Sequence, residues 1–416
     1  MVHGMRNSVA RDKLSFGSQG RALVSKQPMF WLLVACIGMG ALFLTGWPGS
    51  ARAIDLDGIK ITPSVAYQGE YDDNLFRTPS DKKSDYINHY IPAITLEATP
   101  GQHDIKADLS ADILRFSKFT NQDTERFFAN FSSIFKFNRL ELRGREDFAH
   151  TDDFPSSELT TRIKRNENYL GGGFDFDVYG QWGIGFDTTW GDIYYLDHTY
   201  DYLSRDTYDY ATNVYYRITP KTRLFAEYDY VQEFYKYDNT RNDDRQLGLL
   251  GVRGDLMERL SLTAKGGYEH LSFQDPTQGN QNLFAGWLEA NYRPVERLQI
   301  ALLISQDPQA SAYETNFTYT PFNTALALTY AITPKITVIP HGFFGVNRYN
   351  QATLNTDNNT TEKRQDTIYG GGLGIRYEVQ KWIRFEVNYE YTGRNSNFST
   401  FNYDDNRVWF MITFSI

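Results

Sequence analysis

The chain has 416 residues, with 42 Lys and Arg, 51 Asp and Glu, one Cys and 16% aromatic residues. A hydrophobic content of 41% is too high for a disordered chain, and one cysteine cannot form a disulfide framework or a thiolate metal cluster. The negative charge balance excludes a nucleic-acid binder, which needs a basic surface. The mean hydropathy of −0.51 excludes a multi-helix membrane protein. It does not exclude a β-barrel, whose apolar residues occupy alternate positions.

The N-terminal segment has the three parts of an export signal. Basic residues precede the apolar run from Met29 to Phe43, and the small-residue sequence Ala51-Arg52-Ala53 follows it. This order is typical of a secretory signal peptide, so we expect residues 1–53 to be cleaved and 54–416 to form the mature protein. A retained anchor helix is the alternative. Leu33–Cys36 also fits a lipoprotein signal, but cleavage there would divide the apolar run.

From Ile59 to Ile416 the dominant pattern is alternation with a period of two residues, and we find no convincing helical periodicity. In the segment 383–391, apolar or aromatic residues alternate with Arg384, Glu386, Asn388 and Glu390. Successive side chains of a β-strand point to opposite faces. Each such segment is therefore expected to be a strand with one apolar face and one polar face.

Turn signals alternate with longer polar stretches and predict the topology. Short turns are expected near 100–101, 138–139, 180–181, 219–221, 255–256, 294–295, 333–335 and 380–381. Long loops are expected at 72–84, 117–125, 148–165, 192–205, 233–243, 272–281, 305–314, 348–364 and 392–404. Together they connect about 18 strands, with both chain ends on the short-turn side, as in outer-membrane barrels. We therefore predict an all-β fold: a single transmembrane antiparallel up-and-down β-barrel.

Two other all-β folds are alternatives to the barrel. A β-propeller also has recurring strand groups, but it does not need one apolar face on every strand or the asymmetry between short turns and long loops. A soluble β-sandwich of this length would be too large for a single core.

A barrel of 16 to 18 strands encloses an aqueous channel, so the polar side of the alternation predicts the pore lining. The predicted pore-lining residues are Lys106, Asp108, Asp112, Arg143, Arg145, Asp175, Asp177, Asp187, Glu227, Asp229, Lys265, Glu269, Arg384, Glu386, Asn388 and Glu390. Acidic residues outnumber basic ones in this set, so we expect the pore to admit cations and neutral solutes more readily than anions. Because the first expected strand follows closely on Ala53, any occlusion should come from an inward-folded loop: 148–165, 348–364 or 192–205.

Two similar acidic runs are expected to meet at the rim of the barrel. Tyr71-Asp72-Asp73-Asn74 begins the first long loop and Tyr403-Asp404-Asp405-Asn406 opens the last strand. The first and last strands of a closed barrel are neighbours, so Asp72, Asp73, Asn74, Asp404, Asp405 and Asn406 form a possible rim site for Ca²⁺ or sugar hydroxyls. The alternative is two ordinary loop ends rich in Asp and Asn. We expect no other metal and no cofactor.

The sequence does not suggest an enzyme, and we assign no catalytic residues. His89, His103, His150, His198, His270 and His341 are scattered, and no G-x-S-x-G motif or histidine pair at metal-binding spacing occurs. The glycine clusters at 171–173 and 371–374 do not open a predicted helix, so they do not indicate a phosphate-binding loop. Glycines within barrel strands more often ease curvature.

One segment resembles a known family. Tyr71–Pro79, followed by Lys82-Lys83-Ser84-Asp85, is similar to a family of outer-membrane β-barrel porins that is often associated with exopolysaccharide gene clusters. The resemblance implies an outer-membrane location in a Gram-negative-type bacterium. For some members it implies export of a polysaccharide together with periplasmic and inner-membrane components. The sequence departs from most outer-membrane barrels by ending on Phe414-Ser415-Ile416 rather than on an aromatic residue.

The predicted wide lumen, together with what this resemblance implies, leads us to expect a pore for passage or export of an extracellular polysaccharide. A general diffusion porin for small hydrophilic solutes and a closed structural or surface-interaction barrel are the alternatives. The expected partners are outer-membrane lipid and lipopolysaccharide, the outer-membrane assembly machinery and, for an exporter, the polysaccharide and periplasmic export components. A nucleic-acid partner is not expected.

Overall fold

The computed structural model describes residues 54–56, 58–313 and 316–415, so the predicted signal peptide lies outside the described residues. Eighteen long strands follow one another along the chain: β2 (Ile59–Asp72), β3 (Asp85–Ala98), β4 (Asp104–Phe116), β5 (Thr124–Lys136), β6 (Leu140–Thr151), β7 (Arg165–Tyr179), β8 (Trp182–Tyr195), β9 (Arg205–Thr219), β10 (Thr222–Tyr235), β11 (Asp243–Met257), β12 (Leu260–Phe273), β13 (Gln281–Val295), β14 (Leu298–Gln306), β16 (Thr318–Ala331), β17 (Ile336–Asn355), β18 (Thr360–Gln380), β19 (Ile383–Ser396) and β20 (Tyr403–Ser415). Two short strands are added: β1 (Ile54–Leu56) pairs with β2, and β15 (Gln309–Ala310) pairs with β16.

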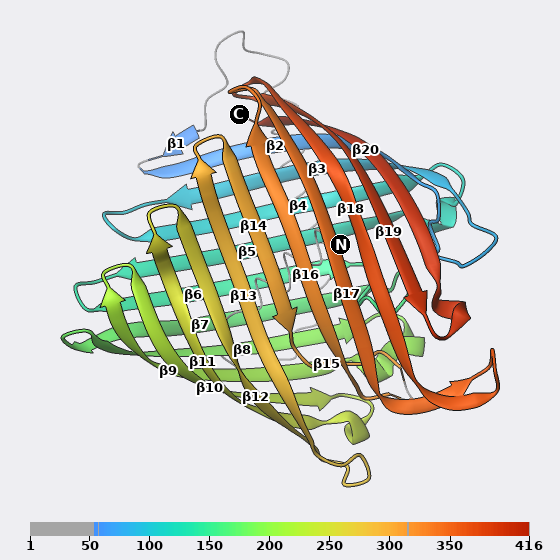
Figure 1. The fold of residues 1–416 in the computed structure, drawn as a ribbon. Coiled ribbons are helices and arrows are strands. Elements are labelled where there is room, and N and C mark those ends of the chain that lie inside the picture. Colours follow the sequence, from blue (N-terminus) through green and yellow to red (C-terminus); the bar gives the residue numbers. More distant parts are fainter. Residues whose placement is uncertain (1–53, 57, 314–315, 416) are drawn as a thin grey trace.

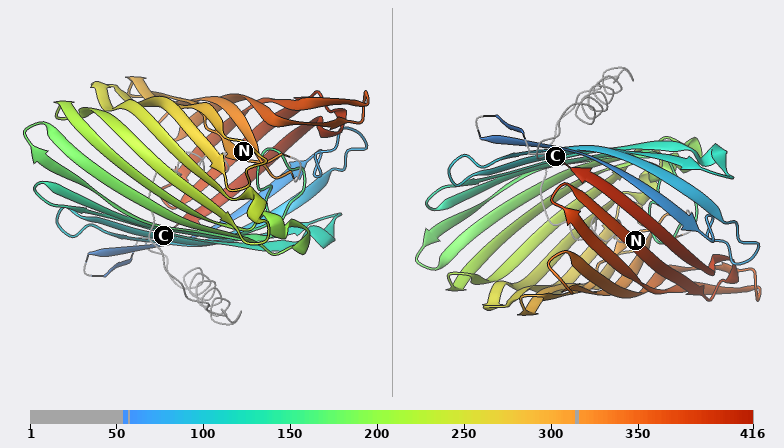
Figure 2. Two further views of the ribbon diagram at one scale, coloured as in Figure 1. Left: turned by 90° about the horizontal axis from the view of Figure 1, so that it is seen from below. Right: turned by 90° about the horizontal axis from the view of Figure 1, so that it is seen from above.

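The long strands form a closed antiparallel barrel (Figures 1 and 2). Each strand pairs with the next, and β20 pairs with β2 over a register from Ser64 opposite Ser415 to Asp72 opposite Arg407. The prediction of an antiparallel barrel of about 18 strands is therefore confirmed. Among the described residues, no helix is long and apolar enough to cross a membrane.

Short turns and long loops lie at opposite ends of the barrel. In the described part of the chain, four short 3₁₀ helices occupy long loops: η1 (Thr120–Gln122), η2 (His198–Leu203), η3 (Asn239–Arg241) and η4 (Ser399–Phe401). Two predicted turns are displaced, because β11 continues to Met257 and β13 to Val295, which moves the turns to 258–259 and 296–297.

The predicted long loop at 348–364 was wrong. β17 continues to Asn355 and β18 begins at Thr360, so only 356–359 connect them. After a register shift that follows Arg348, Ala352 pairs with Lys363 and Asn355 with Thr360. This part of the hairpin extends beyond its neighbours, where no apolar face is needed. Its polar sequence therefore looked like a loop.

The outer face of the barrel carries the apolar side chains. On β10, the outward-facing Leu224 and Tyr228 are 47% and 50% exposed. Phe225 and Glu227, which lie between them in the sequence and face inward, are 7% and 5% exposed. This alternation is that of a barrel whose outer face contacts lipid. A charged residue interrupts this pattern in the middle of β6: Glu146, the seventh of the 12 residues of the strand, is exposed on the outer face.

Candidate functional site: the lumen and the loop across it

The predicted pore-lining residues lie on the inner face of the barrel. The strand register places several of them side by side on one face. Across β6 to β10, Arg143, Gly173, Asp187, Ala211 and Asp229 are successive cross-strand neighbours. All 16 share the face opposite the exposed apolar side chains. That they line a conducting path stays a prediction.

Ion pairs link inner-face side chains of strands β6, β7, β8 and β10. The guanidinium of Arg143 lies 2.8 Å from a carboxylate oxygen of Asp187 and 3.1 Å from one of Asp175. Arg223 approaches Asp175 from the other side at 2.9 Å. Asp175 thus lies between two guanidinium groups, and this wall is cross-linked by charge-assisted contacts, which are stronger than neutral hydrogen bonds.

A second buried pair lies on the neighbouring wall. Lys265 Nζ is 2.9 Å from Glu227 Oε1, with side-chain exposures of 3% and 2%, and it also lies 4.6 Å from the ring centroid of Trp287. Most of the other predicted residues have partners as well. The pairs are Lys106–Asp108, Thr95–Asp108, His89–Asp112, Arg145–Asp147, Arg217–Asp177, Arg384–Glu386 and Arg407–Glu390.

Eight inner-face arginines are missing from the predicted pore lining: Arg126, Arg205, Arg217, Arg223, Arg245, Arg364, Arg394 and Arg407. They have the same alternation as the predicted residues, since Arg223 is in phase with Phe225 and Glu227. Applying the alternation to every strand would have found them. All of these arginines except Arg394 pair with carboxylates, so the inner wall is less acidic than the predicted set suggested.

The loop 152–164, between β6 and β7, crosses the lumen. β17 lies nine strands from β7 in either direction around the barrel, and is therefore on the opposite wall. Asn347 Nδ2 of β17 nevertheless donates to Ser157 Oγ at 2.9 Å. Arg394 Nη1 of β19 donates to the carbonyl oxygens of Ser157 at 2.7 Å and Glu158 at 3.2 Å. The loop is thus attached to both sides of the barrel.

Glu158 fastens this loop to a second one. Its side chain is fully buried, and its carboxylate accepts hydrogen bonds from Ser311 Oγ and from the backbone N–H of Ala312, each at 2.7 Å. Tyr313 Oη donates to the Glu158 carbonyl oxygen at 3.1 Å. Burial raises the pKa of Glu158 to about 7, although the hydrogen bonds from Ser311 and Ala312 act in the opposite direction. We call the contacts of Ser157 and Glu158 the latch.

The loop 307–317 joins the latch to two further loops. Tyr202 Oη of η2 donates to the Ala312 carbonyl oxygen at 2.8 Å, and Arg241 Nη1 of η3 donates to the Tyr313 carbonyl oxygen at 3.1 Å. Ile163, Leu203 and Ala312 are buried in one apolar cluster with side chains of β8. Loops that share a core of this kind are held in place rather than free in solvent.

Two of the three loops predicted to occlude the lumen therefore meet there. The loop 152–164 crosses to the far wall, and the loop that contains η2 reaches it through Tyr202. The segment 348–364 is mostly strand, as described above. The loop 307–317 was not predicted to fold inward, and its local sequence carries no signal that we recognise.

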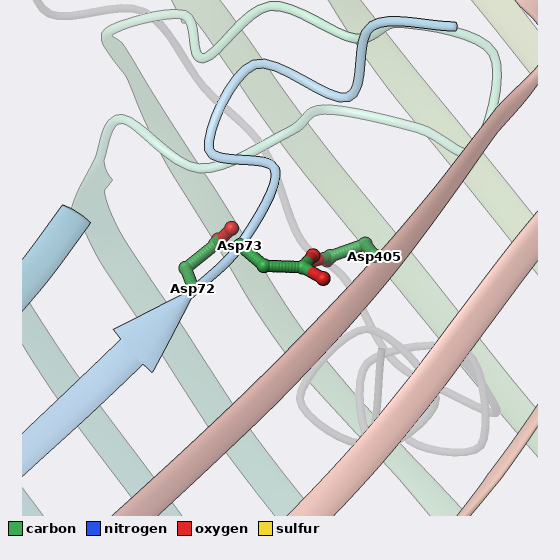
Figure 3. A group of neighbouring side chains, drawn as sticks. All are labelled: Asp72, Asp73 and Asp405. Atoms are coloured by element: carbon green, nitrogen blue, oxygen red, sulfur yellow. The ribbon is translucent and has the colours of Figure 1, made fainter. Parts of the chain in front are cut away.

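The two Tyr-Asp-Asp-Asn runs meet at the seam, as predicted (Figure 3). The Asp73 carboxylate accepts hydrogen bonds from the backbone N–H of Asn406 at 2.7 Å and from Asn406 Nδ2 at 2.8 Å. Asn74 Nδ2 donates to the Asp404 carbonyl oxygen at 2.8 Å. The first and last strands are thus joined by side chains beyond their backbone pairing.

A closed barrel with an apolar outer face, a charged inner face and an inward-folded loop defines a porin-like protein of the outer membrane. Residues 58–415 match the family model described as Putative beta-barrel porin 2, and the chain belongs to this family. No curated protein sequence matches the chain.

Solved structures with similarity to the chain include three outer-membrane proteins. The outer membrane protein opdK from Pseudomonas aeruginosa is 10% identical, with 86% of this chain and 99% of that chain covered and a TM-score of 0.48. The outer membrane channel DcaP of Acinetobacter baumannii is 14% identical over 88% and 100% of the two chains, with a TM-score of 0.44. OprD from Pseudomonas aeruginosa is 11% identical over 88% and 97%, with a TM-score of 0.44.

Proposed function

We propose that the protein is a diffusion channel for small hydrophilic solutes, with a lumen narrowed by the loop 152–164. The observation that carries this proposal is the latch, because it holds the loop across the barrel between opposite walls. A loop in this position reduces the cross-section of the lumen. It therefore favours small solutes over a polymer.

The charged inner wall supports a channel that prefers cations. Beyond residue 53 the chain has 36 basic and 50 acidic residues, because residues 1–53 contain six of the 42 basic and one of the 51 acidic residues. Inner-face arginines neutralise part of the acidic excess, so we expect a modest preference for cations. Reversal potentials in a salt gradient measure it, and clear selectivity for anions would contradict it.

Export of an extracellular polysaccharide is the second candidate. Trp287 and Trp409 are half-buried on the inner face, where an indole ring offers a surface for stacking against a sugar ring. A polymer needs a continuous passage, so this function requires the latch to open and the loop 152–164 to leave the lumen. The association with exopolysaccharide gene clusters stays a prediction from the resemblance.

A closed structural barrel is the third candidate. Networks such as Arg143 with Asp175 and Asp187 stiffen the inner wall. A stiff wall is compatible with a barrel that conducts and with one that does not. These networks therefore do not separate a closed barrel from a channel. A conductance measurement does.

The test is planar-bilayer conductance of the refolded mature protein, first in salt and then with neutral oligosaccharides of increasing length. A matched variant replaces residues 154–161 with a short Gly-Ser linker, and a control variant shortens the loop 274–280. We expect wild type to conduct and to exclude long oligosaccharides, and the loop 152–164 variant alone to conduct more and admit longer sugars. Conductance unchanged by the loop variant would contradict the narrowed-channel proposal. Its absence from wild type and both variants would favour the closed barrel.

A further inference from the structure

We propose that Asp72, Asp73 and Asp405 form a binding site for a divalent cation, with Ca²⁺ as the best match, at the extracellular end of the barrel seam. The proposal does not depend on what passes through the lumen. It concerns the junction of the first and last strands of the barrel, β2 and β20.

The geometry of the three carboxylates fits a single ion. Each offers one oxygen, and these three oxygens lie within 4.8 Å of one another. Asp72 ends β2, Asp73 follows it in the loop, and Asp405 lies on β20 across the seam (Figure 3). Residues more than 300 positions apart in the chain therefore present oxygen ligands to the same small volume.

A second observation indicates that a ligand belongs there. Asp405 is only 2% exposed, and its Oδ1 has no hydrogen-bond partner within the described part of the chain. Asp72 beside it is 4% exposed. A buried carboxylate oxygen without a partner is costly, on the order of a few kcal/mol. A bound cation would satisfy it, and so would a proton shared between Asp72 and Asp405.

The protein's own cations are already engaged. Arg407 Nε lies 3.6 Å from Asp405 Oδ2, but the same guanidinium also contacts Glu70 at 3.9 Å and forms an ion pair with Glu390. One positive charge is thus shared among three carboxylates.

Two other nearby basic side chains contact groups outside the three carboxylates. Lys82 pairs with Asp404, outside the three-carboxylate group. The Arg77 guanidinium stacks on the Phe154 ring, 3.7 Å from its centroid. Arg77 still acts on Asp405, and Arg162 acts on Asp72. Negative charge remains because the carboxylates of Glu70, Asp72, Asp73, Glu390 and Asp405 outnumber Arg77, Arg162 and Arg407.

The ligand chemistry favours Ca²⁺ over Mg²⁺ or a transition metal. Ca²⁺ takes about six to eight oxygen ligands in flexible geometry, including carboxylates that bind through one or both oxygens, and water completes the shell. Mg²⁺ demands a near-ideal octahedron. The group contains no sulfur or imidazole ligand, which softer metals prefer. A cation here would link β2 to β20 and strengthen the seam.

The experiment uses the refolded mature protein in a detergent without phosphate. Tb³⁺ is the probe, with luminescence excited through nearby tyrosines and Ca²⁺ as the competitor. We expect one saturable Tb³⁺ site that Ca²⁺ displaces, and a thermal unfolding midpoint that Ca²⁺ raises by several degrees relative to EDTA. Asp405→Asn should lower Tb³⁺ affinity at least tenfold and remove the Ca²⁺ shift. Asp404→Asn, in the same run but outside the group, should retain both.

Folding of each variant is checked by its mobility on gels before and after heating, and Asp73→Asn replaces Asp405→Asn if that variant does not fold. Absence of a saturable Tb³⁺ site in wild type would overturn the proposal. Equal binding by wild type and both Asp405→Asn and Asp73→Asn would overturn it too. A wild-type barrel that ignores Ca²⁺, while Asp405→Asn is more stable in EDTA, would assign the unpartnered oxygen to a shared proton.

Discussion

The latch is expected to respond to pH through Glu158. In the latched loop, burial holds the pKa of Glu158 at about 7, whereas a solvated glutamate has a pKa near 4.5. The latched state therefore binds a proton more tightly than an open state in which Glu158 meets water. The stabilisation of the latch is complete below pH 4.5 and is lost as the pH rises through 7. The channel should accordingly close more at acidic pH.

The difference between the two pKa values sets the size of the effect. Each pH unit is worth about 1.4 kcal/mol, so a shift from 4.5 to about 7 stabilises the latch by at most about 3.4 kcal/mol. That corresponds to a change of roughly 300-fold in the ratio of closed to open channels. Arg364, Tyr349 and Tyr313 also interact with Glu158, and none of them changes charge between pH 4.5 and 7.

Single-channel recordings between pH 4.5 and 8 measure this ratio directly. Wild type should spend more time closed as the pH falls. Glu158→Gln keeps the side chain's size and removes its titration, so its closed fraction should be independent of pH in this range. Glu362→Gln, at a half-buried carboxylate of the β17–β18 hairpin that contacts Asn355 and Asn358, is the matched control outside the latch and should behave as wild type. A pH response that persists unchanged in Glu158→Gln would refute the reasoning.

Three further predictions concern other parts of the barrel. Arg394→Met removes the guanidinium whose Nη1 donates to the carbonyl oxygens of Ser157 and Glu158. It should weaken the latch by about 1–3 kcal/mol and increase open time in recordings, whereas Arg384→Met at the other end of β19 should not. Glu146→Leu removes a charge from the lipid-facing wall and should stabilise the barrel in phospholipid vesicles by about 1 kcal/mol; destabilisation in urea titrations would mean that a neighbour covers this carboxylate. Lys265→Met removes the ammonium that lies 2.9 Å from the buried Glu227 carboxylate and should lower the free energy of unfolding by about 3–5 kcal/mol. The double variant with Glu227→Leu should recover most of that loss, and failure to recover would show that the pair is not coupled.

The strands could be predicted from the sequence because lipid imposes a regular pattern on them. Lipid-facing positions between the interfaces are mostly apolar, with Glu146 an exception, so alternation such as that of 383–391 recurs in the strands. The same rule predicted the closure of the barrel, and with it the meeting of Asp73 and Asn406. It also predicted the inward direction of Glu227 and Lys265, although not their pairing.

The pattern failed where the lipid constraint ends. Beyond the membrane a strand can be polar on both faces, so the outer half of the β17–β18 hairpin looked like a loop. The latch was beyond prediction for a different reason. Glu158 and Ser311 are 153 residues apart, and Ser157 and Arg394 are 237 apart. No local periodicity specifies which residues of two polar loops meet.

Separating two strands of the barrel wall needs more free energy than releasing the latch. This difference decides where the channel can open. Each wall strand is held by a ladder of backbone hydrogen bonds on both sides, and inner-face pairs such as Arg143–Asp187 add charge-assisted contacts. The latch rests on a small number of side-chain hydrogen bonds, each worth on the order of 1 kcal/mol net. Releasing Glu158 and Ser157 therefore needs far less free energy than opening the wall. Any change in the passage is accordingly expected from the loop 152–164, with the barrel unchanged.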